Sequence, residues 1–176
     1  MKRKQLVKAM RDRRYVTMRR RRGWQEYDGF VAAVGDEWFA LLHAPHVLYQ
    51  GLVLMRVADV GAVKERGLRG RTKRALKLDG AWPPAVPESL VLDDTRSVLF
   101  TAGSLAVALG IGHEDDHPGV FVAAVERITR KRLVCREVDP DGTWGRTVSP
   151  PLARLTQVLL WDPYVERITA LAEAPR

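Results

Sequence analysis

Apolar and polar residues alternate in short runs along most of this chain, a pattern typical of half-buried β-strands. In the first half these runs cover 15–18, 29–34, 38–42, 51–57 and about 60–63. In the second half they cover 104–109, 119–125, 133–138, 143–148 and 155–159. Turn signals such as Gly35-Asp36 and Asp139-Pro140-Asp141-Gly142 separate them. We therefore expect a mainly β protein with flanking helices (α+β) and five short strands in each half.

Helical patterns flank both sets of strands. Residues 2–12 place apolar side chains on one side and basic side chains on the other. Asp93 or Asp94 can cap a second helix, and Asp162-Pro163 provides a cap and a first turn for the last one. The segment 68–78 is basic and weakly helical. Each half is thus expected to contain a helix, five strands and a helix.

An internal repeat supports a division into two halves. The pentapeptide Phe-Val-Ala-Ala-Val occurs at 30–34 and again at 121–125, 91 residues later. Between the copies, the stretch 80–87 contains three prolines, which is typical of a linker. We expect a basic domain at 1–79, a Pro-rich linker at 80–92 and a second domain at 93–176.

A helix followed by five short antiparallel strands is the layout of a small bent barrel. The first half resembles the Sm-like family. The segment 29–42, apolar residues around Gly29 and Asp36 followed by an apolar strand, resembles that family's first motif. The segment 51–60 resembles part of the second motif. Extended to the second half by the repeat, the resemblance implies two tandem Sm-like small β-barrels.

The resemblance also implies binding of single-stranded RNA. Two positions depart from the family pattern, because Ala40 stands where the family has a base-contacting Asn and Val57 stands where a Gly follows the Arg. Alanine has no amide that could hydrogen-bond a base edge. Arg56, which precedes Val57, remains a candidate nucleic-acid contact. We expect a different basic surface to supply most of any binding to nucleic acid.

Charge is distributed unevenly along the chain. The net charge is +8, but residues 1–80 hold 19 of the 29 basic and 8 of the 21 acidic residues, which gives them a charge of +11. Residues 81–176 carry −3. Such asymmetry suggests that the basic half binds a polyanion, since cations that neutralise phosphates give salt-sensitive affinity without sequence preference. The alternative is a solvated or protein-binding face.

The densest cationic run is Arg19-Arg20-Arg21-Arg22. Side chains of a strand alternate between faces, so an unbroken strand would turn Arg20 and Arg22 into the core. Because burying two arginines there would be costly, we expect the chain to bend near 19–23. The four arginines would then form an exposed corner with Trp24 and Tyr27. Arg19, Arg20, Arg21, Arg22, Trp24 and Arg56 are therefore the predicted nucleic-acid-binding residues.

The sequence contains no motif that predicts an enzyme. It has neither a phosphate loop nor a dinucleotide fingerprint, and no pair of carboxylates has a spacing suited to acid–base catalysis. The run His113-Glu114-Asp115-Asp116-His117 could hold a divalent ion, but its spacing favours a polar turn. His43 and His46 flank a proline in a loop, and Cys135 has the pattern of a buried strand residue. No catalytic residue, metal site or cofactor is predicted.

The sequence thus favours a non-enzymatic module that contacts RNA or DNA mainly through phosphates. The alternative is a protein-interaction or adaptor protein whose exposed strand edges pair with a partner or with another copy in a homo-oligomer. The single cysteine excludes an internal disulfide framework. With no apolar stretch of membrane-spanning length and no signal peptide, we expect a cytoplasmic protein without a membrane partner.

Overall fold

The structure is a computed structural model that describes residues 2–21, 25–113 and 119–174. Its α-helices are α1 (Lys2–Arg11), α2 (Arg69–Leu78), α3 (Thr95–Gly103) and α4 (Pro163–Glu173). The strands of the first half are β1 (Tyr15–Arg20), β2 (Glu26–Val34), β3 (Trp38–His43), β4 (Leu52–Arg56) and β5 (Val60–Glu65). Those of the second half are β6 (Leu109–His113), β7 (Val120–Ile128), β8 (Leu133–Val138), β9 (Trp144–Val148) and β10 (Leu155–Leu160). The expectation of a mainly β chain is confirmed.

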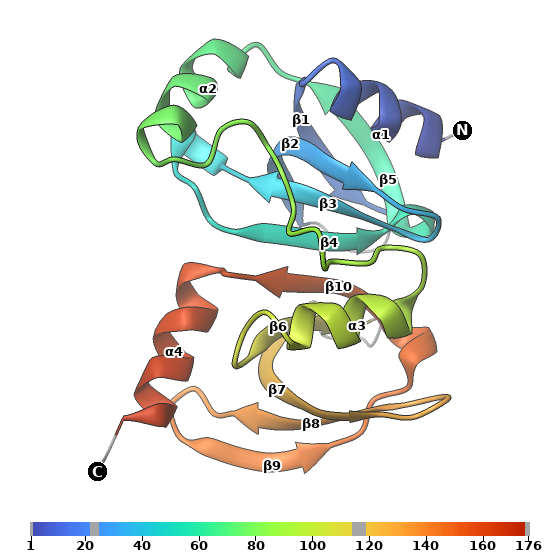
Figure 1. Cartoon of the computed structure of the whole chain (residues 1–176), viewed down its shortest axis with the longest axis vertical. Coiled ribbons are helices and arrows are strands. Elements are labelled where there is room, and N and C mark those ends of the chain that lie inside the picture. Colours follow the sequence, from blue (N-terminus) through green and yellow to red (C-terminus); the bar gives the residue numbers. More distant parts are fainter. Residues whose placement is uncertain (1, 22–24, 114–118, 175–176) are drawn as a thin grey trace.

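The ten strands form one continuous antiparallel sheet in the order β5-β1-β2-β3-β4-β10-β6-β7-β8-β9. The predicted pair of separate, closed small barrels is therefore wrong. Figure 1 shows the two sets of strands stacked one above the other, with β4 and β10 side by side where they meet. Within each set, the fifth strand lies beside the first, and the strands then follow in chain order.

The junction between β4 and β10 explains why the halves do not close separately. Four residue pairs join the two strands, from Gln157 opposite Met55 to Leu160 opposite Leu52. A free strand edge leaves backbone donors and acceptors without partners, and a half of about 85 residues buries little apolar surface alone. Joining the edges satisfies these groups and extends the core across both halves.

The largest core cluster draws residues from both halves. Phe30, Trp38 and Leu54 of the first half pack in the same cluster as Ile111 and Leu160 of the second. On the other face of the sheet, a second cluster lies under α1 and a third lies under α4. The main core thus extends across the predicted domain boundaries at 79 and 93.

Both predicted helix caps are present. The Asp94 side chain accepts hydrogen bonds from the backbone N–H groups of Arg96 and Ser97, and Asp162 does the same for Tyr164 and Val165. The strand expected at 104–109 is wrong, because the chain leaves α3 at Gly103 and the strand begins only at Leu109. The apolar run before Leu109 lies in a loop in which Val107 is 60% exposed. In the described parts of the chain, no helix has the length and apolarity needed to cross a membrane.

Candidate nucleic-acid interface

The predicted arginine corner is only partly at the surface. Arg19 and Arg21 are exposed, while Arg22 and Trp24 lie outside the described residues. Arg19 sits opposite Glu26 in the pairing of β1 with β2, so the two side chains share one face of the sheet. A neighbouring carboxylate lowers the attraction of Arg19 for a phosphate.

Arg20 is buried instead of exposed. It is 9% exposed, and its guanidinium donates to Thr156 Oγ1 at 2.5 Å and to Gln157 Oε1 at 3.3 Å, both on β10. Tyr27, which we had expected beside the arginines at the surface, is 8% exposed and donates to the same Gln157 oxygen at 2.9 Å. These hydrogen bonds offset the cost of burying the cation. Arg20 therefore links β1 to the second half and faces away from solvent.

Arg56 also joins the two halves. Its guanidinium donates to the backbone oxygens of Leu152 at 2.6 Å and Ala153 at 2.8 Å, and to Thr95 Oγ1 at 3.1 Å. It lies 5.7 Å from the centre of the Trp38 ring. Its nearby residue Ala40, at the position of the family's base-contacting Asn, is fully buried. The Arg56 guanidinium is thus engaged within the chain, and position 40 has no amide with which to contact an RNA base.

A second group of cations surrounds Trp82, in the loop after α2. Lys73 Nζ lies 5.1 Å from the centre of the Trp82 ring, and the guanidinium carbon of Arg13 lies 5.8 Å from it. The ring itself packs edge to face on the buried Phe30, with centroids 5.2 Å apart. We call Arg13, Lys73 and Trp82 the Trp82 cluster. The ring orients two cations from distant parts of the sequence toward one surface, by cation–π attraction.

The helix α2 continues this cationic surface. Arg69, Lys73 and Lys77 recur every four residues and so lie along one side of the helix, next to the buried Thr72 and Leu76. No acidic residue occurs between Arg66 and Leu78. Among the described residues, none of the cations of α2 forms an ion pair. We call Arg69, Lys73 and Lys77 the α2 stripe.

The sequence of α2 is poor for an isolated helix. Its N-cap residue, Leu68, makes no side-chain cap hydrogen bond, and its first turn contains Gly70 and two arginines but no acidic residue. Cations at a helix N-terminus are unfavourable because they meet the positive end of the helix dipole. Gly70 also disfavours an ordered first turn, because glycine loses more backbone freedom on folding than any other residue. An anion bound along α2 would relieve this electrostatic cost.

Arg11 and Arg14, which lie close to Arg13 in the sequence, both form ion pairs with acidic side chains. Asp12 accepts hydrogen bonds from Arg11 and Arg14, and these bonds, led by that of Arg11, hold the pKa of Asp12 below its ordinary value. Arg14 also pairs with Glu65 at 2.6 Å. Arg13, by contrast, is exposed and has no ion pair within the described ranges. Of these three arginines, it is the one whose charge is left for an external anion.

Sequence reasoning identified the basic group of α2 but missed Trp82 and Arg13 as its partners. Trp82 lies in the proline-rich stretch that predicted only a linker, and Arg13 follows a helix 60 residues before Lys73. No spacing rule connects positions so far apart. In the folded chain, Trp82 packs on Phe30 and both cations lie against its ring.

The remaining polar candidates that lie within the described residues are His43, His46, His113 and Cys135. No cluster of three or more metal-type ligands occurs in the part of the chain that the structure describes. Of the run at 113–117, only His113 lies within that part. Burial lowers the pKa of His43, whose Nδ1 lies 3.0 Å from the backbone oxygen of Asp28. Burial also raises the pKa of Cys135 to about 12, so its thiol is protonated near neutral pH.

Comparisons with family models, curated proteins and solved structures give no match to this chain.

Proposed function

We propose that this chain is a non-enzymatic module that binds the phosphate backbone of RNA or DNA through the α2 stripe and the Trp82 cluster. The observation that carries this proposal is the meeting of Arg13 and Lys73 on Trp82, beside a helix whose cations have no described acidic partner. Held cations lose less side-chain entropy when they bind a phosphate than cations on freely moving stems. Binding of this kind is electrostatic and largely independent of sequence.

The Sm-like resemblance and the arginine corner contribute less to this proposal. Arg20 and Arg56 donate their hydrogen bonds within the chain, and Arg19 faces Glu26. Arg21, directly after β1, is exposed and remains available to a phosphate. We therefore expect a smaller contribution from the β1 arginines than from α2.

A salt series tests the proposal. The dissociation constant for a short mixed-sequence single-stranded RNA is measured by fluorescence anisotropy between about 50 and 200 mM salt, and again for duplex DNA. The test variant is Arg69→Gln, Lys73→Gln, Lys77→Gln. Each lost phosphate contact removes about 0.7 to 0.9 from the slope of log affinity against log salt, so the three substitutions should lower it by about 2.

The matched control removes the same charge from the other half. It is Arg136→Gln, Arg146→Gln, Arg167→Gln, and its slope should equal that of the unchanged protein. Absence of any binding at the lowest salt would contradict the proposal. Equal loss of affinity in both variants would show that net charge, and not the α2 stripe, governs binding.

The adaptor alternative uses the two free strand edges, β5 and β9. Both carry features that oppose edge pairing. Lys2 Nζ donates to the backbone oxygen of Gly61 on β5, at 2.5 Å. Arg146 lies on β9, and Pro150 and Pro151 follow one residue after its end. Light scattering of the purified chain tests this alternative, and our proposal expects a monomer.

A further inference from the structure

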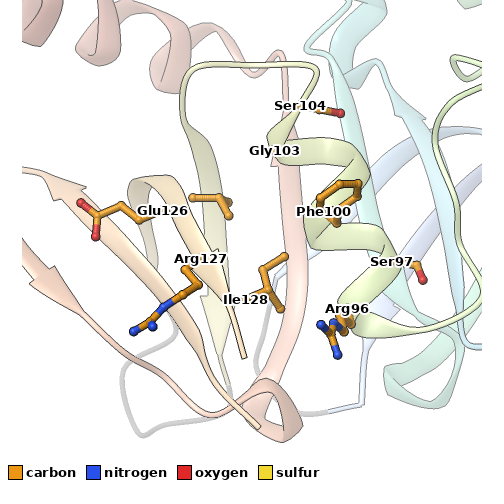
Figure 2. Close-up of a pocket in the computed structure, with 9 residues that line it drawn as sticks. Arg96, Ser97, Phe100, Gly103, Ser104, Glu126, Arg127 and Ile128 are labelled. Carbon is orange, nitrogen blue, oxygen red and sulfur yellow. The ribbon is translucent and has the colours of Figure 1, made fainter. Parts of the chain in front are cut away.

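A groove of about 570 Å³ lies between α3 and β7, in the second half of the sheet. Phe100 from the helix and Val125 and Ile128 from the strand give it an apolar floor. Figure 2 shows Phe100 and Ile128 facing the space between the two elements, with Arg96 at one end. A Cβ atom on Gly103 would meet the Val125 side chain at 3.1 Å, so the glycine lets helix and strand approach closely at the other end.

A large apolar side chain, that of Phe100, is exposed to solvent in the groove. Phe100 is 70% exposed, although it lies on the helix whose Val98, Leu99 and Ala102 are buried in the main core. A phenylalanine left in water at the side of an apolar groove forgoes the free energy that burial of its ring would provide. Apolar surface arranged around a groove is typical of a binding site.

Cations occur on both elements that line the groove and in the turn after β7, although residues 81–176 carry −3 overall. Arg96 and Arg127 line the groove, and the exposed Arg130 and Lys131 follow in the turn between β7 and β8. None of these four forms an ion pair with any acidic side chain that the structure describes. The acidic lining residue, Glu126, accepts a long hydrogen bond of 3.5 Å from Thr147.

We propose that this groove docks a peptide segment of a partner protein in which a large apolar residue is flanked by Asp or Glu. The apolar residue would lie between Phe100, Val125 and Ile128, and the carboxylates would meet Arg96 and the cations after Ile128. A nucleobase fits less well, because its polar edge would be buried against aliphatic side chains that offer no hydrogen bonds. The inference is independent of the proposed phosphate surface, since it concerns the other half of the sheet.

Selection from random dodecapeptides displayed on phage, with the full chain as bait, tests this inference. We expect enriched peptides that combine Leu, Ile, Phe or Trp with Asp or Glu. The affinity of a synthetic enriched peptide is then measured for Phe100→Ser and for Arg96→Gln with Lys131→Gln. Loss of the Phe100 ring, which the bound peptide would cover, should weaken binding at least about tenfold. Loss of two cations should weaken binding less and reduce its salt dependence.

Leu171→Ser is the matched control, because Leu171 is 52% exposed on α4 in the same half. It should bind the peptide like the unchanged chain. The inference is overturned if no peptide is enriched, if enriched peptides lack acidic residues, or if Phe100→Ser binds normally. It is also overturned if a short single-stranded DNA competes for the same groove with equal affinity, because the occupant would then be a nucleic acid. None of these variants touches α2, so RNA binding reports on the proposed function separately.

Discussion

Arg13 has a backbone φ of 47°, in the left-handed region that residues other than glycine and asparagine adopt at a cost. It lies two residues after the end of α1, and its N–H donates to the backbone oxygen of Met10 at 3.0 Å. Glycine is the common residue at this position of a helix end. The chain therefore retains a strained arginine at the place where its side chain reaches Trp82, which is expected where the side chain has a role.

Replacing Arg13 by glycine separates backbone strain from charge. We predict that Arg13→Gly keeps the stability of the fold or raises it by up to about 1 kcal/mol, because the strain is relieved. The same variant should bind RNA more weakly and lower the salt slope by about 1. Urea unfolding and the anisotropy series measure the two effects. A variant with full affinity would remove Arg13 from the interface.

His43 makes the stability of the chain depend on pH. Burial lowers its pKa in the folded state, so between that value and the unfolded value of about 6.5 the unfolded chain binds more protons. Stability is therefore complete above about pH 6.5 and falls as the pH drops through this window. We predict that His43→Gln reduces the loss of unfolding free energy between about pH 7.5 and pH 5. An unchanged pH dependence in this variant would contradict the assignment.

At the level of elements, the alternation of apolar residues was sufficient to place most strands. The strands β3, β8 and β10 lie within one residue of the predicted ranges at each end. It failed at 104–109, where a short apolar run has no periodicity that separates a strand from a packed loop. The burial of Arg20 could not be predicted from the sequence either, because its hydrogen-bond partners Thr156 and Gln157 are more than 130 residues away.

Arg56 illustrates how a candidate binding residue becomes a structural one. Its guanidinium donates hydrogen bonds to two backbone oxygens in the 3-10 turn before β10, so it links β4 to the second half. We predict that Arg56→Lys destabilises the chain by about 2 kcal/mol, because lysine cannot donate to both oxygens in the same planar geometry. Urea unfolding measures this loss. RNA affinity should stay unchanged, whereas a nucleic-acid contact would show the opposite pattern.

For the whole molecule, the joined sheet predicts one folding unit. Within each half the first four strands follow chain order, but the sequence carries no signal for the pairing of β4 with β10. Hydrophobic patterning determines which face of a strand is buried, but it does not determine which strand edges pair with each other. The prolines of the predicted linker suggested two separate domains. Amino-acid composition could not show that the two halves share one core.

We predict a single cooperative unfolding transition for the chain. The main core cluster contains residues of both halves, so neither half can unfold without exposing the other. Urea unfolding followed by far-UV circular dichroism and by tryptophan fluorescence should give coincident curves. Two separated transitions would indicate that the halves are stable on their own.

The measurement that tests the central claim most directly is an NMR titration of the labelled chain with single-stranded RNA. Our account predicts that the Trp82 indole N–H and the amides of Arg13 and α2 shift first and most, and that these shifts disappear at high salt. The account would be contradicted if those resonances stayed in place while residues of β1 or of the second half shifted.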